Sequence, residues 1–595
     1  MAAMVLLCSC SSTPETASPL SPPTEKGESE TVVSDSLLSW AEEDTAVVDT
    51  TGATVITLAD SGSLVEGTGA SATERGVTVT SGGVYLVRGT LSDGQLRVES
   101  SDDSTVFLIM DGARIHSETT APLFVREAHK TVIHLAGGSE NTLSDSASAV
   151  YEDVENEEPS GALFSKSDLT LNGSGTLTVN AAFKDGIVSR DGLKIADGSV
   201  TVSAADDALM GRDYVLIGGG RLHLTATGDG IKSTNDASAQ VGIVRIEGGE
   251  LHVESGADGI QAESTLSVVG GTVQVVSGGG SQNAPAQQGN DFGFRLETTE
   301  TESVGKALKA KTILEMRGGT VTLDAADDAV HSNDAVTIDG GTLTVSAGDD
   351  GVHADRTLTI ASGKLTIETS YEGLEAKTIT LDGGDVRITA SDDGINASSG
   401  SSEEEVNFGG FGGDPFETDD SALYIRGGTL HVDAMGDGID SNGTIDMTGG
   451  TVTVVGPSNG GNGTLDCNGS FTVTGGTLVA IGSSGMAQTP SSDTMNAIVW
   501  GGCALTSGRT LSVCDRQGNE IVSLEATRAA NWAYILSPEL IAGEEYTLSD
   551  GYESRTITHS GGLHQIGTVG GMGGGFGGGR PDMGGNRPGM PPHGF

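Results

Sequence analysis

The chain has 595 residues, of which 91 are glycine and only 4% are aromatic, and its formal net charge is −51. This charge excludes nucleic acid and anionic lipid surfaces as direct partners, because both would be repelled, and it favours multivalent cations. So few large side chains in so long a chain argue against one ordinary globular core and favour many short strands joined by tight turns.

The first segment resembles a bacterial lipoprotein signal. In the run Leu7-Cys8-Ser9-Cys10 a small residue precedes Cys10, which is the predicted lipidation site of a signal covering residues 1–10. Residues 11–44 are rich in Ser, Thr, Pro and Glu, which predicts a disordered tether. We therefore expect a lipid-anchored protein at the bacterial cell surface or outside the cell, with this anchor as its only contact with the membrane.

An acidic turn recurs along the middle of the chain. The residues that directly precede its glycine or alanine, here called the marker residues, are Asp185, Asp207, Asp229, Asp258, Lys306, Asp328, Asp350, Glu372, Asp393, Asp437 and Asn459. Uninterrupted steps between them are about 22 residues long, and the long steps coincide with insertions at 277–303 and 398–420. A nearly constant interval over so many copies predicts one structural unit that stacks on itself.

Each interval has the pattern of three short strands. Residues 357–360 and 364–367 alternate polar and apolar side chains, and a shorter strand is expected at 352–354 after the acidic turn. No interval has room for a helical crossover, so each unit buries its Leu, Ile and Val only against its neighbours. The predicted fold is an all-β, right-handed parallel β-helix with about 22 residues and three strands per coil.

The domain organisation follows from where this pattern holds. We expect the β-helix over residues 45–490, with the two insertions in it. Residues 491–568 keep strands but lose the interval, which predicts a β cap over the C-terminal end of the stack. Residues 569–595 are glycine-rich and are expected to be a disordered tail. The whole chain is expected to be a monomer.

Stacking would place the acidic turns in a column with about 4.8 Å between neighbouring carboxylates. The lysines of this region, Lys232, Lys306 and Lys309, are expected to be isolated, so the repulsion calls for a hard cation with oxygen ligands, which favours Ca²⁺. The alternative is a turn in which Asp bonds its own backbone and glycine takes positive φ. The predicted calcium ligands are Asp185, Asp206, Asp207, Asp229, Asp258, Asp327, Asp328, Asp349, Asp350, Glu372, Asp392, Asp393 and Asp437.

Two histidines, His331 and His353, fall on adjacent coils of the predicted stack. Such a pair either binds a transition metal or forms an exposed imidazole stack, and the exposed stack is the preferred interpretation.

Several segments resemble one bacterial family, among them "ATGDGIKSTND", "DDAVHSNDAVTIDGGTLTVSAGDDGVHADRTLTI" and "ASDDGINASSG". They are similar to the carbohydrate-binding domain-containing proteins, a family defined by a clostridial calcium-binding β-helix with affinity for cellulose and acidic polysaccharide. The resemblance covers roughly residues 75–565. It implies an extracellular, calcium-loaded β-helix similar in fold to pectate lyases, whose calcium-binding turns look like "GDGID", here Gly436 to Asp440.

Two classes of function remain open at this point. The first is a non-catalytic, calcium-dependent polysaccharide-binding protein, for acidic plant-type polymer or cellulose, or within the same class a surface adhesin or structural rod. The second is a calcium-dependent, pectate-like lyase, which needs a basic residue to remove a proton; Lys232 is the best candidate and Lys309 the second. Catalytic residues are assigned to neither class.

Overall fold

The computed structural model describes residues 38–284, 305–399, 418–492 and 494–568. The predicted signal with Cys10, the tether as far as residue 37, the tail, and parts of both insertions lie outside these residues, so the predictions for them stay predictions. The chain divides into two units, Met1–Ser39 and Trp40–Phe595, and the strands belong to the second. Among the described residues, no helix is both long enough and apolar enough to span a membrane.

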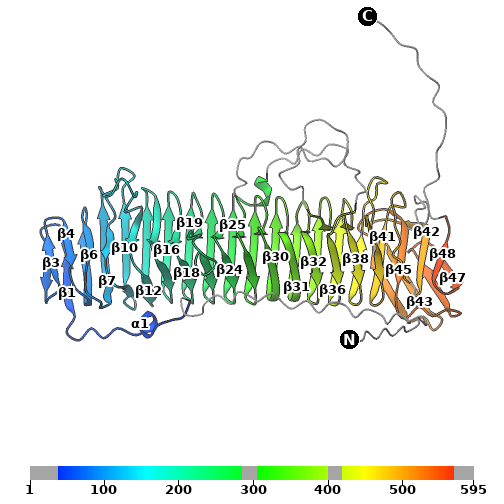
Figure 1. Ribbon diagram of the computed structural model, residues 1–595, viewed down its shortest axis with the longest axis horizontal. Coiled ribbons are helices and arrows are strands. Elements are labelled where there is room, and N and C mark those ends of the chain that lie inside the picture. The colour runs from blue at the N-terminus through cyan, green and yellow to red at the C-terminus, as the bar shows by residue number, and fades with distance from the viewer. Residues whose placement is uncertain (1–37, 285–304, 400–417, 493, 569–595) are drawn as a thin grey trace, which may run out of the picture. The chain divides into compact units, whose positions relative to one another are not determined.

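In the described part of the second unit, β-strands are the main regular secondary structure. One sheet contains 44 strands, most of them paired in parallel, and the described helices are the short α1 (Glu42–Thr45) and η1 (Ser281–Asn283). In Figure 1 most strands follow one another in chain order, from blue to red, except that β45 (Ala530–Leu536) lies between β41 (Thr477–Gly482) and β42 (Ala497–Leu505). The prediction of an all-β fold dominated by parallel pairing is confirmed.

The parallel strands form three rows, because most strands pair with the third strand before and after them in the chain. The first row follows the acidic turns and contains β4 (Gly76–Val79), β6 (Gln95–Glu99), β8 (Leu123–Glu127), β11 (Gly161–Ser165), β14 (Asp185–Ser189), β17 (Leu209–Gly211), β20 (Ile231–Ser233), β23 (Ile260–Ala262), β26 (Leu308–Ala310), β29 (Val330–Ser332), the starts of β31 (Val352–Thr369) and β32 (Leu374–Leu381), β34 (Ile395–Ala397) and β37 (Ile439–Ser441).

The second row comes next within each interval. It contains the starts of β5 (Gly83–Leu91) and β7 (Val106–Ser117), β9 (Thr131–Leu135), β12 (Leu169–Gly173), β15 (Gly192–Ile195), β18 (Tyr214–Ile217), β21 (Ile243–Ile246), β24 (Thr265–Val268), β27 (Ile313–Met316), the start of β30 (Ala335–Ala347), the middle of β31, the end of β32, β35 (Ala422–Ile425), β38 (Thr444–Met447) and β40 (Phe471–Val473).

The third row leads into the next acidic turn. It contains the ends of β5 and β7, β10 (Glu140–Asp145), β13 (Thr176–Ala181), β16 (Ser199–Ala204), β19 (Arg221–Ala226), β22 (Glu250–Ser255), β25 (Thr272–Ser277), β28 (Thr320–Ala325), the ends of β30 and β31, β33 (Asp385–Ala390), β36 (Thr429–Ala434), β39 (Thr451–Val455) and β41 (Thr477–Gly482). Here Val321 pairs with Leu343, and Leu343 with Leu365, so paired positions are separated by the same interval as the marker residues.

Both ends of the sheet depart from parallel pairing. At the start, β1 (Thr54–Leu58) pairs with β5 in parallel but with β2 (Leu64–Glu66) antiparallel, and β3 (Ala70–Thr73) is antiparallel to β4. At the end, β45 (Ala530–Leu536) lies antiparallel between β41 and β42 (Ala497–Leu505), and β48 (Leu563–Ile566) pairs with β42. A separate antiparallel sheet orders β44 (Glu520–Glu525), β43 (Thr510–Asp515), β46 (Glu545–Ser549) and β47 (Ser554–Thr558).

The core lies between the rows and is made of the apolar side chains of the alternating pattern. In β28, Val321 and Leu323 are buried, whereas the residues before each of them are exposed. One continuous cluster of such side chains runs from Ile56 to Leu536. This alternation places every second side chain on the outer surface, so the polar residues of the turns and of the outer faces remain available for binding.

The end of the predicted tether needs a correction, because residues 40–44 pack against the second row. The indole of Trp40 donates a hydrogen bond to Glu247 Oε2 at 2.8 Å. Asp44 is fully buried; its carboxylate lies 2.6 Å from Lys130 Nζ and 3.1 Å from Lys194 Nζ. Lysines buried to this extent require an anionic partner, and composition alone does not show that the segment supplies one.

Candidate functional site

The marker residues from Asp185 to Asp437 line the edge of the first row, where each turn leads into a short strand. The prediction of Asn459 as the last marker is wrong, because the N–H that follows Asp437 in this edge belongs to Gly463. A marker aspartate uses its Oδ1 atom to accept the backbone N–H of the next marker residue in the row, over 2.6–3.4 Å. This bond is made by Asp185, Asp207, Asp229, Asp258, Asp328 and Asp393, to Asp207, Asp229, Asp258, Lys306, Asp350 and Asp437 respectively. The aspartate therefore joins successive turns, which differs from the expected bond within its own turn.

The glycine that follows a marker residue is not there to adopt positive φ, as the hypothesis of a simple Asp-Gly turn would require. None of Gly230, Gly351 and Gly394 has positive φ. A Cβ atom on Gly351 would lie 2.6 Å from the Cδ1 atom of Ile367 and 2.7 Å from the carbonyl oxygen of Gly373. These positions exclude a side chain because the core and the next turn approach the backbone closely.

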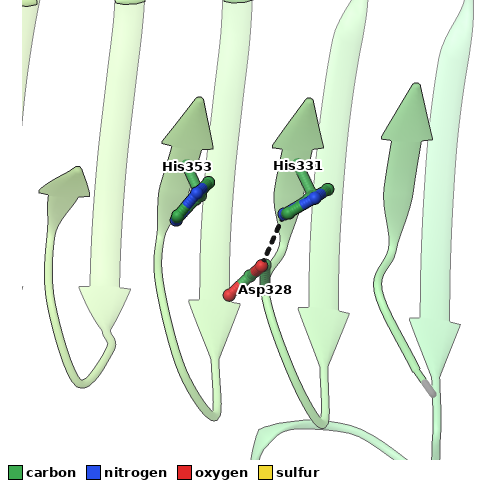
Figure 2. Close-up of side chains that lie close together, drawn as sticks. All are labelled: Asp328, His331 and His353. Carbon is green, nitrogen blue, oxygen red and sulfur yellow. Dashed lines mark hydrogen bonds and ion pairs between the residues drawn. The ribbon is translucent and has the colours of Figure 1, made fainter. Parts of the chain in front are cut away.

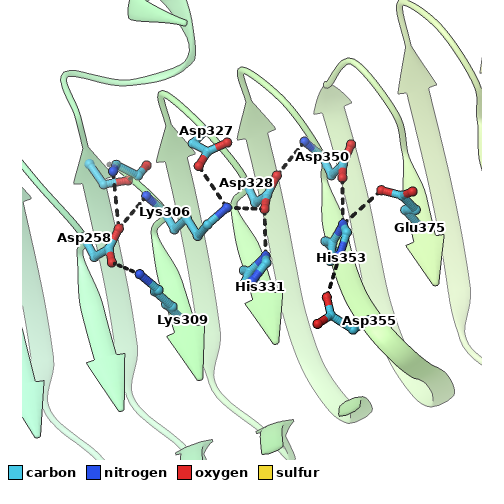
Figure 3. Close-up of polar contacts among 12 residues, drawn as sticks. Asp258, Lys306, Lys309, Asp327, Asp328, His331, Asp350, His353, Asp355 and Glu375 are labelled. Carbon is cyan, nitrogen blue, oxygen red and sulfur yellow. Dashed lines mark hydrogen bonds and ion pairs between the residues drawn. The ribbon is translucent and has the colours of Figure 1, made fainter. Parts of the chain in front are cut away.

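The expectation of isolated lysines is wrong. Lys232 Nζ lies 3.3 Å from Asp207 Oδ2 and 2.9 Å from Asp229 Oδ2. Lys306 Nζ contacts Asp327 and Asp328, and Lys309 Nζ lies 2.8 Å from Asp258 Oδ2 (Figure 3). In this middle part of the column, Oδ1 of the marker aspartate accepts a backbone N–H, and Oδ2 forms an ion pair with a lysine ammonium group.

Lys232 is held as a cation by these contacts. Burial opposes its charge, but Asp207 and Asp229 outweigh that effect and raise the pKa of Lys232 above its usual value. A protonated ammonium group cannot accept a proton, so the geometry does not favour Lys232 as the base of an elimination reaction.

The two histidines are not the exposed stack that was preferred from the sequence. Their rings do stack, with centroids 5.0 Å apart, but each ring also contacts carboxylates. His331 Nδ1 lies 2.8 Å from Asp328 Oδ2, and His353 Nδ1 lies 3.0 Å from Asp350 Oδ2. The side chains retain only 13% and 22% of their exposure, because the first row and its turns enclose them.

Two carboxylate clusters differ in how they are neutralised. Asp437, Asp440 and Asp466 each offer an oxygen within 4.8 Å of the other two, and among the described residues no lysine or arginine forms an ion pair with them. Burial raises the pKa of Asp437 to about 7, and burial followed by the charges of Asp437 and Asp466 raises the pKa of Asp440 to about 8. Three neighbouring carboxyl groups of this kind do not ionise together at neutral pH without a cation.

The second cluster consists of Asp185, Asp206 and Asp207, at the other end of the marker column. The Oδ2 atom of Asp185 is buried and has no hydrogen-bond partner among the described residues. Burial, and after it the charge of Asp207, raises the pKa of Asp185 to about 6. Lys232 and Lys184 lie beside this cluster, Lys184 Nζ at 3.8 Å from Asp206 Oδ2, so its charge is partly compensated.

The predicted ligands therefore do not form one uniform column. Asp229, Asp258, Asp327 and Asp328 face lysines, whereas Glu372 accepts a hydrogen bond from Asn396 and has its pKa raised to about 8 by burial and then by Glu375. Burial and then the charge of Asp437 raise the pKa of Asp393. Asp349 and Asp392 directly precede marker residues, and the oxygen of Asp349 lies within 4.8 Å of those of Asp327 and Asp328.

The sequence prediction missed Asp440, Asp466, Asp355 and Glu375 as candidate site residues. A signal existed for two of them. Asp440 ends the segment "GDGID", and Glu375 follows His353 by one repeat interval, so it is the next residue of the same column. Asp466 gave no such signal, because it lies in a stretch without the regular acidic turn.

Comparison with known proteins gives a consistent result. Residues 73–351 and 351–513 match the model of a family described as carbohydrate-binding domain-containing protein. A protein of Acetivibrio thermocellus with the same description is 38% identical over 136 residues, which are 23% of this chain and 48% of that relative. The chain thus matches about half the length of this curated relative.

A solved structure, that of the polysaccharide lyase-like protein from C. thermocellum as a gadolinium derivative, is also similar. The sequence identity is 25%, and the match covers 52% of this chain and 97% of that one with a TM-score of 0.35.

Proposed function

Because the chain belongs to the carbohydrate-binding domain-containing protein family, we propose that it is a non-catalytic protein that binds polysaccharide outside the bacterial cell, with Ca²⁺ as its cofactor. The family supports the class of ligand. The lysine-free cluster of Asp437, Asp440 and Asp466 is the observation that carries the calcium dependence.

The fold that we propose for this function is the right-handed parallel β-helix, with one acidic turn per coil. Pairing of each strand with the third strand along the chain supports it, as does the spacing of paired positions in the third row, which equals the interval between marker residues. Such a stack offers a long surface on which the repeating units of a polymer meet repeating side chains.

The chemistry of the cluster fits Ca²⁺. Calcium takes six to eight oxygen ligands, and carboxylates supplemented by backbone carbonyls and water are its usual donors. The Oδ1 atoms of Asp437 and Asp466 also accept the N–H groups of Gly463 and Cys467, which hold both carboxylates in place. Asp440 lies on β37, and Asp466 follows Leu465, which pairs with Ile439, so residues from two neighbouring units would hold one ion.

The net charge restricts how an acidic polysaccharide can bind. At −51 the protein repels an acidic polymer at long range, and binding becomes favourable only where bound cations locally reverse the sign. We therefore propose that Ca²⁺ bridges an acidic polysaccharide to the protein. Binding to cellulose, which is neutral, would depend on hydroxyl contacts and much less on calcium.

The test is a pull-down of the full chain on polygalacturonate and on cellulose, with about 1–5 mM Ca²⁺ or with excess chelator. We expect chelator to abolish binding to polygalacturonate and to change binding to cellulose little. The double variant Asp437→Asn, Asp440→Asn should lose at least about tenfold in affinity for the acidic polymer, because it removes two of three charges from the cluster.

Asp446→Asn is the matched control, since Asp446 is a half-buried aspartate on β38 in the neighbouring second row. Equal binding of polygalacturonate with and without chelator would contradict the calcium bridge. Absence of binding to either polymer would contradict polysaccharide binding and favour a surface adhesin or structural rod. Release of unsaturated product would favour the lyase.

A further inference from the structure

His353 has carboxylates at both of its ring nitrogens. Its Nδ1 atom lies 3.0 Å from Asp350 Oδ2 and 2.9 Å from Glu375 Oε2, and its Nε2 atom lies 3.1 Å from Asp355 Oδ1 (Figure 3). Asp350 is the marker residue before β31, and His353 and Glu375 are paired residues of β31 and β32. The rigid parallel register therefore brings all of these groups to one point.

Without a metal, the carboxylates at both nitrogens favour the protonated ring. Burial opposes its charge, but the hydrogen bonds to Asp350, Asp355 and Glu375 outweigh burial and raise the pKa of His353. A metal ion at Nδ1 would take the place of the proton on that nitrogen.

Asp355 selects the tautomer that a metal requires. A neutral ring that donates Nε2–H to Asp355 directs the Nδ1 lone pair at Asp350 and Glu375. The Nδ1 lone pair of His353 then faces one carboxylate oxygen of Asp350 and one of Glu375. Among the described residues, no lysine or arginine forms an ion pair with either carboxylate. Metal-ligating histidines commonly donate their second N–H to a carboxylate in this way.

The donor set and its dimensions match zinc better than calcium. One ligand atom from each of Asp350, His353 and Glu375 lies within 4.8 Å of the ligand atoms of the other two. A tetrahedral Zn²⁺ with ligands at about 2.0–2.2 Å places them about 3.3 Å apart, close to the contacts of Nδ1 with Asp350 and Glu375. One imidazole nitrogen with two carboxylates leaves a fourth position for water, whereas calcium prefers oxygen donors alone.

We propose that Asp350, His353 and Glu375 form a zinc site, with Asp355 as the residue that positions His353. The ion would join two successive turns of the stack at its middle. This site is separate from the Asp437 cluster in donor type and in position, and it does not depend on the polysaccharide that the protein binds.

The neighbouring histidine, His331, is not a ligand of this site. His331 contacts Asp328 (Figure 2), but Lys306 Nζ already lies 2.5 Å from Asp328 Oδ2 and 2.9 Å from Asp327 Oδ2. An ammonium group beside these oxygens repels a second cation. The zinc site is therefore placed on the side of His353 that carries Asp350 and Glu375.

The chain contains a second histidine stack that serves as a matched control. The rings of His223 and His252 are 4.8 Å apart, and His252 Nε2 lies 3.1 Å from Glu254 Oε1. However, the Nδ1 atom of His252 faces the amide of Gln274 at 3.4 Å, where His353 faces two carboxylates. The control thus has the stack and the positioning carboxylate but lacks the anionic ligands.

The experiment is a calorimetric titration of the metal-stripped full chain with Zn²⁺, in buffer with millimolar Ca²⁺ to occupy the oxygen-only clusters. We expect one saturable zinc site in the wild type, its loss in His353→Gln, and unchanged binding in His252→Gln. Asp355→Asn should weaken binding about 10- to 100-fold, because it leaves the ligands in place and loosens only the ring. Substitution with Co²⁺ should give visible absorption bands that the His353 variant lacks.

All variants keep the five cysteines of the chain, so a thiol site would bind zinc equally in each of them. Zinc binding that persists in His353→Gln, or that His252→Gln reduces as much, would overturn the proposal, as would no saturable zinc binding by the folded wild type. If His353→Gln does not fold, Glu375→Gln and Asp355→Asn decide the question, and unchanged affinity in both would overturn it. Polymer binding is scored separately, so failure here leaves the calcium proposal standing.

Discussion

The marker aspartates show how one side chain fulfils a structural and an electrostatic role at once. Oδ1 of Asp229 accepts the backbone N–H of Asp258, and Oδ2 of the same residue contacts Lys232. Asp437 forms no ion pair with a lysine or arginine among the described residues, and its carboxylate lies close to those of Asp440 and Asp466. The same residue type therefore supports the fold throughout the column but is a candidate cation ligand only in parts of it.

Removing the charge of Asp44 is expected to lower the free energy of unfolding more than removing that of any other single carboxylate. Asp44→Asn keeps the shape but leaves Lys130 and Lys194 without their buried anion, so the free energy of unfolding should fall by about 3–5 kcal/mol. Urea unfolding measures this. Glu43→Gln is the control, because Glu43 is partly exposed and its ion pair with Lys130 should contribute less than about 1 kcal/mol. Equal stability of the Asp44 variant and the wild type would contradict this account.

At the scale of the element, the unit is an acidic turn followed by three short strands. The turns are held together by side chain to backbone bonds between successive turns, and the strands by parallel ladders. Glycine after the marker residue allows the core of one unit to approach the turn of the next. An asparagine side chain can accept the same N–H, so the architecture needs an oxygen acceptor, whereas cation binding needs the charge.

Substitutions of Asp393 can distinguish the role of the carboxylate as a hydrogen-bond acceptor from the role of its charge. Its Oδ1 atom accepts the N–H of Asp437 at 2.6 Å, and burial and the charge of Asp437 raise its pKa. We expect Asp393→Asn to be as stable as the wild type or more stable when calcium is absent, since it keeps the acceptor and removes a like charge. Asp393→Ala should lose about 1–3 kcal/mol, because the N–H of Asp437 is left without a partner.

Thermal unfolding in chelator, with stability compared between the two variants, tests this prediction. Asp385→Ala is the control, since Asp385 begins β33 on the outer face and should change stability by less than about 0.5 kcal/mol. Equal losses in Asp393→Asn and Asp393→Ala would show that the charge, and not the acceptor, matters at this position.

At the scale of the molecule, the shifted carboxyl groups predict an acidic stability optimum without divalent cations. The pKa values of Asp185, Asp437, Asp440 and Glu372 are raised to about 6, 7, 8 and 8, mainly by burial. Groups whose folded pKa is raised hold more protons in the folded state, so the stability linked to them is complete below about pH 4 and is lost as pH rises through 6 to 8.

The opposite sign applies to Asp44, whose pKa is lowered because its bonds to Lys130 and Thr170 outweigh burial. Its stabilisation is present above about pH 4 and is lost in stronger acid. In chelator we therefore expect the unfolding temperature to peak near pH 5 and to fall by pH 8.5, by an amount equivalent to at least about 2 kcal/mol. Calcium should restore most of this loss at pH 8.5. A melting temperature that rises from pH 5 to pH 8.5 in chelator would contradict the assignment.

Much of the architecture could be predicted from local pattern. Alternation with period two specifies strands whose apolar side chains share one face, and a nearly constant repeat interval leaves parallel stacking as the way to bury them. The departures lie where distant segments meet. Lys309 pairs with Asp258 across 51 residues that include an insertion, so no local pattern shows that the column contains its own cations.

The strands, their interval, the position of the acidic turns and the family could all be inferred from the amino-acid sequence, because each depends on residues that are near one another or equally spaced. The folded chain was needed to show which carboxylates contact a lysine, which contact a histidine and which lie near other carboxylates. It also placed Trp40 on Glu247, 207 residues away, and buried Asp44 between two lysines. Charge pairing and burial depend on distance in space, and the parallel register sets this distance for side chains that are far apart in the sequence.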